Sequence, residues 1–268
     1  PDFKNATLRG GPHAGRPWNL ALDSIWQGYG LINAADAYLL LRGGGWPFDA
    51  TEEEATRGWI RRLAGVIESG LRAWTLWAEF RMAGEPEGAP EPPSVVRHRT
   101  DNHLSWALAS LLAAAAALGD DALAGYALAG SEWSDGRSEP YANPATFADA
   151  VDRAVENGPG TEGRIFEERI LREPPVGYAL FHLEAMSLTA RIAAVHLALD
   201  LWSFEGADGA GMLHAFRRYA AILSGATLSP EPEERLDRAR WLFALSPEGF
   251  GGADRPMLLA AKQPPAHA

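Results

Sequence analysis

Long segments with apolar residues at helical spacing are the feature that most constrains the fold of this chain. Between residues 18 and 42 apolar side chains recur three or four positions apart, and the run Gly43-Gly44-Gly45 ends the pattern. Similar segments follow at 49–77, 102–118, 121–130, 144–156, 175–202, 212–223 and 233–245. Alternating runs of β-branched residues are almost absent, and residues 131–146 are turn-rich, as in a surface loop. The sequence therefore predicts an all-α fold.

The helices are long enough, and apolar over enough of their surface, to pack as helical hairpins. With 268 residues, of which 47% are apolar, the chain can bury a substantial core. We expect one domain over 1–268, an incomplete α/α toroid with an irregular lead-in at 1–17 and an irregular tail at 249–268. A plain helical bundle is the alternative. The ten tryptophans favour the toroid, because aromatic side chains commonly line the sugar-binding groove of such folds.

Composition narrows the classes of function. The formal net charge of −11 argues against general binding to nucleic acid. The chain has no cysteine, which excludes thiolate chemistry, and it has no H-E-x-x-H or similar ligand spacing, so neither a metal nor a cofactor is predicted. No apolar run reaches membrane-spanning length. The chain starts at Pro1 without a charged and apolar leader, so we expect that an export signal was removed or never present.

The first of two polar clusters is the run 97–106, Arg-His-Arg-Thr-Asp-Asn-His-Leu-Ser-Trp. Thr100 or Asp101 can cap the helix predicted at 102–118, which places Asn102 and His103 in its first turn. A helix start offers backbone N–H groups, and nearby cationic side chains add to its preference for an anion. The cluster is a candidate anion-binding site, and a solvated, capped helix start is the alternative.

The second cluster is the run 162–182, which is polar up to Pro174-Pro175 and then opens an apolar helix. Tyr178 lies in the first turns of that helix, and His182 follows one turn later. Tyr178 could also pack on neighbouring apolar residues, and His182 could be a buried histidine. An acidic polymer would need a local basic cleft, for which the two clusters supply Arg97, His98, Arg99, His103, Arg164, Arg169 and Arg172.

These motifs resemble the alginate lyase superfamily of α/α-toroid polysaccharide lyases. The family hallmark is an Asn-His pair in an N-H-x-x-W context, followed later by an Arg and a Tyr at the start of a helix. Asn102-His103 with Trp106, and then Arg172 with Tyr178, fit this pattern. Trp18-Asn19 at a helix start fits more loosely. The resemblance spans roughly residues 18–245.

The resemblance implies cleavage of a β-1,4-linked polyuronate by β-elimination, without a cofactor. Arg172 and the amide of Asn102 would neutralise the C6 carboxylate of the sugar, so that the C5 proton can leave. Tyr178 would accept that proton and protonate the departing O4, while His103 either positions the phenol or serves as the base. The implied substrate-binding residues are Trp18, Asn19, Arg99, Trp106, Arg169 and His182.

The choice of polymer stays open between mannuronan (alginate), glucuronan and mixed polymers. In mannuronate and glucuronate the C5 hydrogen and O4 lie on one face, so a single Tyr can serve both, whereas guluronate requires a base and an acid on opposite sides. Gly177 stands where the alginate enzymes often have His. The substrate class implies a secreted or periplasmic protein, with a cytoplasmic location open. The oligomeric state is not indicated.

Two other classes of function remain open at this point. A glycoside hydrolase on the same kind of toroid would pair Glu167 or Glu168 with Asp101 as its two carboxylates. The other class is a non-catalytic carbohydrate-binding or scaffold protein with a helical toroid.

Overall fold

The structure, a computed structural model, describes residues 24–75, 100–137, 139–143, 145–170 and 175–224. Over these residues the regular secondary structure is helical apart from one two-stranded sheet, which confirms the all-α prediction. The chain divides into two compact units, Pro1–Ala150 and Val151–Ala268, and the boundary falls within helix α8 (Phe147–Ala154). The arrangement of the helices into a toroid, and the single domain over 1–268, stay predictions.

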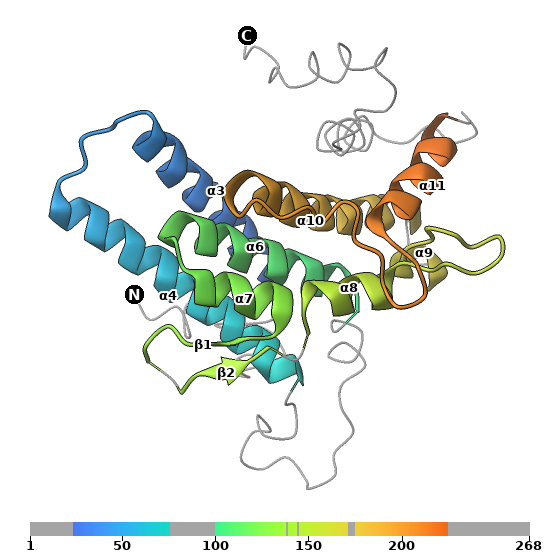
Figure 1. The fold of residues 1–268 in the computed structure, drawn as a ribbon, viewed down its shortest axis with the longest axis horizontal. Helices are drawn as coiled ribbons and strands as arrows, with labels where there is room; N and C mark the ends of the chain where they lie inside the picture. The colour runs from blue at the N-terminus through green and yellow to red at the C-terminus, as the bar shows by residue number, and fades with distance from the viewer. Residues whose placement is uncertain (1–23, 76–99, 138, 144, 171–174, 225–268) are drawn as a thin grey trace, which may run out of the picture. The chain divides into compact units, whose positions relative to one another are not determined.

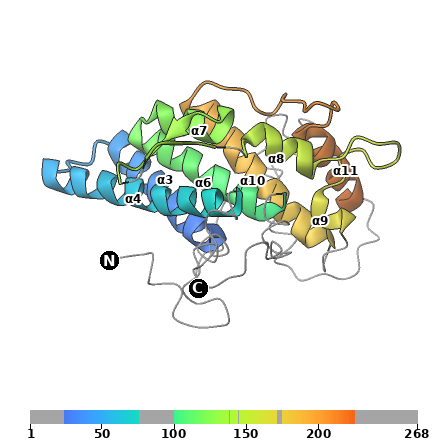
Figure 2. The same ribbon diagram turned by 90° about the horizontal axis from the view of Figure 1, so that it is seen from below.

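Helix α6 (Asn102–Leu118) is the centre of the first unit. It packs against α3 (Ser24–Gly43), α4 (Ala50–Thr75) and α7 (Asp121–Ala129), as Figures 1 and 2 show. Nearly all of its residues are buried, because its Leu and Ala side chains leave no polar face for solvent. Gly119 ends α6 in the left-handed conformation that glycine adopts without steric cost.

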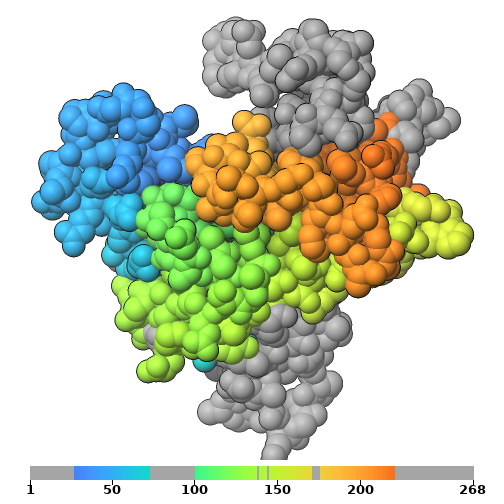
Figure 3. Space-filling view, in the orientation of Figure 1, coloured from blue at the N-terminus to red at the C-terminus, as the bar shows by residue number. Residues whose placement is uncertain are grey.

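Capping residues explain where the helices of this unit begin. Asp49 and Glu52 each accept the other's backbone N–H at the start of α4, a capping box with Asp49 as the cap. Asp120 caps α7 through the N–H of Leu123, at 3.0 Å. At the turn between α3 and α4, Leu40 and Trp46 are exposed, and this tip projects from the rest of the unit (Figure 3, blue).

The segment 131–146 differs from the predicted loop. It contains a short antiparallel pair, β1 (Glu132–Trp133) and β2 (Tyr141–Ala142), joined in the register Glu132 with Ala142 and Trp133 with Tyr141. Two residues a strand are too few for alternation to be visible in the sequence. The helix predicted at 144–156 is shorter, since Thr146 caps α8 and exchanges hydrogen bonds with Asp149.

The second unit is built on α10 (Pro175–His196), which packs against the short helix α9 (Phe166–Arg169) and against α11 (Met212–Ser224). The helix predicted at 175–202 was too long, because Ala198 turns into the left-handed region at φ 54°. Asp200 then accepts the N–H of Trp202 in a local turn. α9 was not predicted, whereas the helix predicted at 212–223 is confirmed.

Several predicted features lie outside the described residues: the lead-in 1–17, the start of the helix predicted at 18–42, the helix at 233–245 and the tail 249–268. None of the described helices is long and apolar enough to cross a membrane.

Candidate active site

The Asn-His pair lies at the buried start of α6. Asn102 is fully buried and His103 is 7% exposed. Of the two candidate caps, Thr100 and Asp101, it is Asp101 that caps the helix. Its Oδ1 accepts the backbone N–H of His103 at 3.0 Å. The backbone N–H groups of His103 and Leu104 are thus bonded to Asp101, and the side chains of Asn102 and His103 lie in the first turn.

The same carboxylate also holds the ring of His103. Nδ1 of His103 lies 2.8 Å from Oδ1 of Asp101, and Asp101 has no exposed surface. Because a carboxylate accepts but does not donate, Nδ1 is the protonated nitrogen in this contact, and Nε2 of the neutral ring carries the lone pair. The sequence suggested Asp101 as a cap, but it did not predict this second contact.

Trp106, predicted to contact the sugar, lies in the interior of the first unit. Its ring is fully buried, and its centroid is 4.2 Å from that of Tyr29 on α3. Its backbone carbonyl accepts the hydroxyl of Ser110 at 2.6 Å. The ring contact joins the first turns of α6 to α3, whereas the hydrogen bond lies within α6. Substrate contact by Trp106 stays a prediction.

In the second unit, Tyr178 lies half-buried in the first turns of α10. His182, one turn further, is fully buried and its Nδ1 lies 2.8 Å from Oε2 of Glu167 on α9, which is also fully buried. The sequence did not predict Glu167 as this partner. Arg172, Arg99, Trp18 and Asn19 lie outside the described residues.

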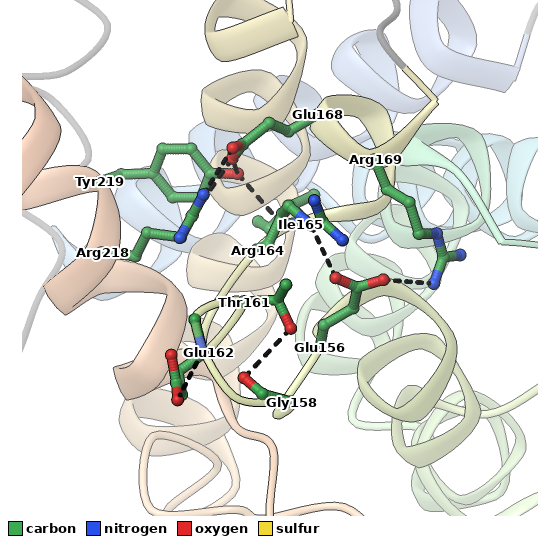
Figure 4. Close-up of polar contacts among 11 residues, drawn as sticks. Glu156, Gly158, Thr161, Glu162, Arg164, Ile165, Glu168, Arg169, Arg218 and Tyr219 are labelled. Atoms are coloured by element: carbon green, nitrogen blue, oxygen red, sulfur yellow. Dashed lines mark hydrogen bonds and ion pairs between the residues drawn. The ribbon is translucent and has the colours of Figure 1, made fainter.

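A polar network ties α9 to α11 (Figure 4). Glu168 accepts hydrogen bonds from Arg218 at 2.6 Å and from the hydroxyl of Tyr219 at 2.7 Å. That same hydroxyl accepts the backbone N–H of Ile165 at 3.1 Å. Arg218 and Tyr219 were not identified from the sequence.

The network shifts the pKa of its members. Burial alone would raise the pKa of Glu168, but the hydrogen bonds from Arg218 and Tyr219 and the nearby positive charges outweigh burial and lower it. The hydrogen bond to Glu168 raises the pKa of Arg218. Burial, and then the bond to Glu168, raise the pKa of Tyr219, so this phenol stays protonated and serves as a structural donor.

Two of the predicted basic residues are already paired in the second unit. Glu156 lies between Arg164, at 2.7 Å, and Arg169, at 3.2 Å (Figure 4). Arg169 is exposed and also lies over the ring of Phe166. Their charges are therefore partly balanced within this unit, and substrate binding by Arg169 stays a prediction.

A cavity of about 660 Å³ in the first unit lies away from the Asn-His pair. It is lined at the opposite end of α6 by Leu118 and Gly119 and by residues of α3 and α4. Arg57, which lines it, donates to the carbonyl of Leu118 at 2.7 Å and so satisfies the end of the helix. Among the residues that the structure describes, no group of acidic or histidine side chains could hold a metal ion.

Comparison with known families gives one match. The model of the family described as "Alginate lyase" matches residues 16–227, a range that includes both polar clusters. No curated protein and no solved structure matches the chain. Because the family model covers most of the chain, the chain belongs to the alginate lyase family and is a polysaccharide lyase.

Proposed function

We propose that this lyase cleaves a β-1,4-linked polyuronate, either mannuronan (alginate) or glucuronan, by β-elimination. The observation that carries the proposal is the buried start of α6, where the amide of Asn102 lies next to the ring of His103, whose Nδ1 is held by Asp101. Such a site suits a sugar carboxylate whose negative charge grows as the C5 proton leaves.

The proposed roles follow from what each side chain can donate or accept. Asn102 donates to the C6 carboxylate, and Arg172 supplies a fixed positive charge and a forked donor. Tyr178 returns a proton to O4 as the glycosidic bond breaks, and His103 either takes the C5 proton or positions the phenol that does so.

The carboxylates that a glycoside hydrolase would need have other partners. Glu167 hydrogen-bonds His182, Glu168 holds Arg218 and Tyr219, and Asp101 holds His103. An acid and a base for hydrolysis must instead be available to the glycosidic oxygen and to water. These contacts favour elimination over hydrolysis at the two clusters.

An acidic polymer as substrate has consequences for where the enzyme is located and for how its net charge affects binding. We propose a secreted or periplasmic enzyme, because long polyuronates do not cross a membrane unaided. The overall net charge of −11 repels such a polymer at long range, so binding depends on local cationic side chains, among them Arg99 and Arg172.

The test is a panel of purified mannuronan, glucuronan and mixed alginate, followed by ultraviolet absorbance and by a reducing-end assay. Elimination leaves an unsaturated uronide, so absorbance and reducing ends should rise together on at least one polymer. Reducing ends without absorbance would indicate a hydrolase. Neither signal, with retention of the polymer, would indicate a binding protein, and both of these results contradict the proposal.

A further inference from the structure

A buried carboxylate and an imidazole form a pair at the start of α6. Oδ1 of Asp101 accepts two hydrogen bonds from the same residue, the backbone N–H of His103 at 3.0 Å and its ring Nδ1 at 2.8 Å. Asp101 is fully buried and the His103 side chain is 9% exposed. The two residues are separated by one position, so the contact is local to the helix start.

Capping alone does not require a carboxylate at this position. Asn, Ser and Thr cap helices about as well as Asp, and Thr100 stands next to it. A buried charge is costly unless it is paired. What the negative charge adds is a strong acceptor for Nδ1–H, which selects one tautomer of the ring and stabilises the imidazolium that forms when the ring takes up a proton.

We propose that Asp101 is a positioning residue for the lyase reaction. It fixes the ring of His103 with Nδ1–H directed at Oδ1, so that Nε2 is the nitrogen that exchanges a proton during elimination. The proton taken from C5 goes onto Nε2, the electron pair of the C5–H bond forms the C4–C5 double bond, and the C4–O4 bond breaks with a proton from Tyr178. This inference rests on the proposed function and specifies which atom of the site acts.

The test is Asp101→Asn in the full chain. Asparagine keeps the cap, so the circular dichroism spectrum should be unchanged and the unfolding midpoint should stay within about 4 °C. Its amide is a weaker acceptor and can also donate, so the ring is no longer held in one tautomer. We expect kcat to fall on the order of 10²-fold or more, with a much smaller change in KM.

A direct readout of the ring is long-range ¹H–¹⁵N correlation of the histidine side chains, with the His103 signal assigned by its loss in His103→Gln. The parent should show the pattern of an Nδ1–H ring, and Asp101→Asn should shift this signal toward the other tautomer. The matched control is Asp120→Asn, which changes the cap of α7 at the same 3.0 Å contact to a backbone N–H. It should leave kcat, KM and the His103 signal as in the parent.

Two results overturn the inference: an Nε2–H ring in the parent, or an Asp101→Asn variant that keeps the kcat of the parent. A parent without activity on any polyuronate would overturn the proposed function, and with it the role of Asp101. An active parent with an unaffected variant would overturn the inference alone.

Discussion

Each candidate site segment contains a histidine whose Nδ1 lies 2.8 Å from a buried carboxylate oxygen. Asp101 holds His103 in the first unit, and Glu167 holds His182 in the second. Both rings are therefore oriented by a charged acceptor and not by apolar packing alone. The two histidines differ in burial: the His182 side chain has no exposed surface, whereas the His103 side chain is 9% exposed. His103 is thus the better placed of the two for proton exchange with a ligand.

The sequence drew attention to the individual residues of these two pairs, but it did not predict that they contact each other. Asp101 was recognisable as a cap because the chain changes there from polar to apolar. Its contact with the ring depends on the His103 rotamer, which no spacing rule specifies. Glu167 and His182 are 15 positions apart on different helices, so their contact depends on how α9 packs against α10.

At the residue scale, Glu168→Gln should change how stability depends on pH. Because Arg218 and Tyr219 lower the pKa of Glu168 in the folded state, its contribution is fully present above the ordinary glutamate pKa of about 4.5 and is lost as the pH falls through the lower, folded value. The variant should be less stable than the parent by about 1–3 kcal/mol near neutral pH.

Urea denaturation over a pH series measures this effect. The difference in free energy of unfolding between parent and variant should shrink as the pH falls below about 4.5, because protonated Glu168 and the glutamine that replaces it are then both neutral. A difference that stays constant over this range would contradict the role assigned to the ion pair with Arg218.

Among the elements, helices with clear caps were predicted best. α6 and α7 begin at Asp caps and end at Gly119 and Gly130, both left-handed, and their predicted bounds agree with the structure within a residue. The run of apolar residues continues beyond His196, where the helix ends, because Leu197, Leu199 and Leu201 lie in a segment that turns at Ala198. Apolar spacing does not report the backbone turn that ends a helix.

At the element scale, two glycines of α3 should respond in opposite ways to alanine. A side chain at Gly28 would meet the hydroxyl of Ser110 and the carbonyl of Trp106 on α6, whereas one at Gly30 meets nothing within 4 Å. Gly28→Ala should therefore destabilise the protein by about 1–3 kcal/mol. Gly30→Ala should stabilise it by up to about 1 kcal/mol, because alanine is the better helix former.

Thermal unfolding of the two variants provides the comparison, with each serving as the control for the other. Since α3 packs against the first turns of α6, Gly28→Ala should also lower lyase activity more than Gly30→Ala. Equal stabilisation by both substitutions would show that α3 and α6 are not packed as closely as the structure has them.

For the whole molecule, the family match over residues 16–227 spans both units. Asn102 and His103 belong to the first unit, and Arg172 and Tyr178 belong to the second. The sequence could predict the family and the residue types, because the motifs are local. It could not predict how distant segments come together, since that depends on the summed packing of all helices. The proposed joint role of His103 and Tyr178 in one elimination reaction is the central claim.

A double-mutant cycle on ultraviolet-detected cleavage tests that claim most directly, with His103→Gln, Tyr178→Phe and the double variant. Tyr178→Phe should lower kcat/KM by roughly 10³-fold or more and leave a measurable residual rate, with an unchanged circular dichroism spectrum. Tyr141→Phe, which keeps its ring beneath Arg72 at 4.6 Å, should retain activity. Residues that act as a unit are strongly non-additive, so the double variant should be no worse than the more impaired single variant. Losses in kcat/KM that multiply, or full activity in Tyr178→Phe, would contradict the joint action of the two segments.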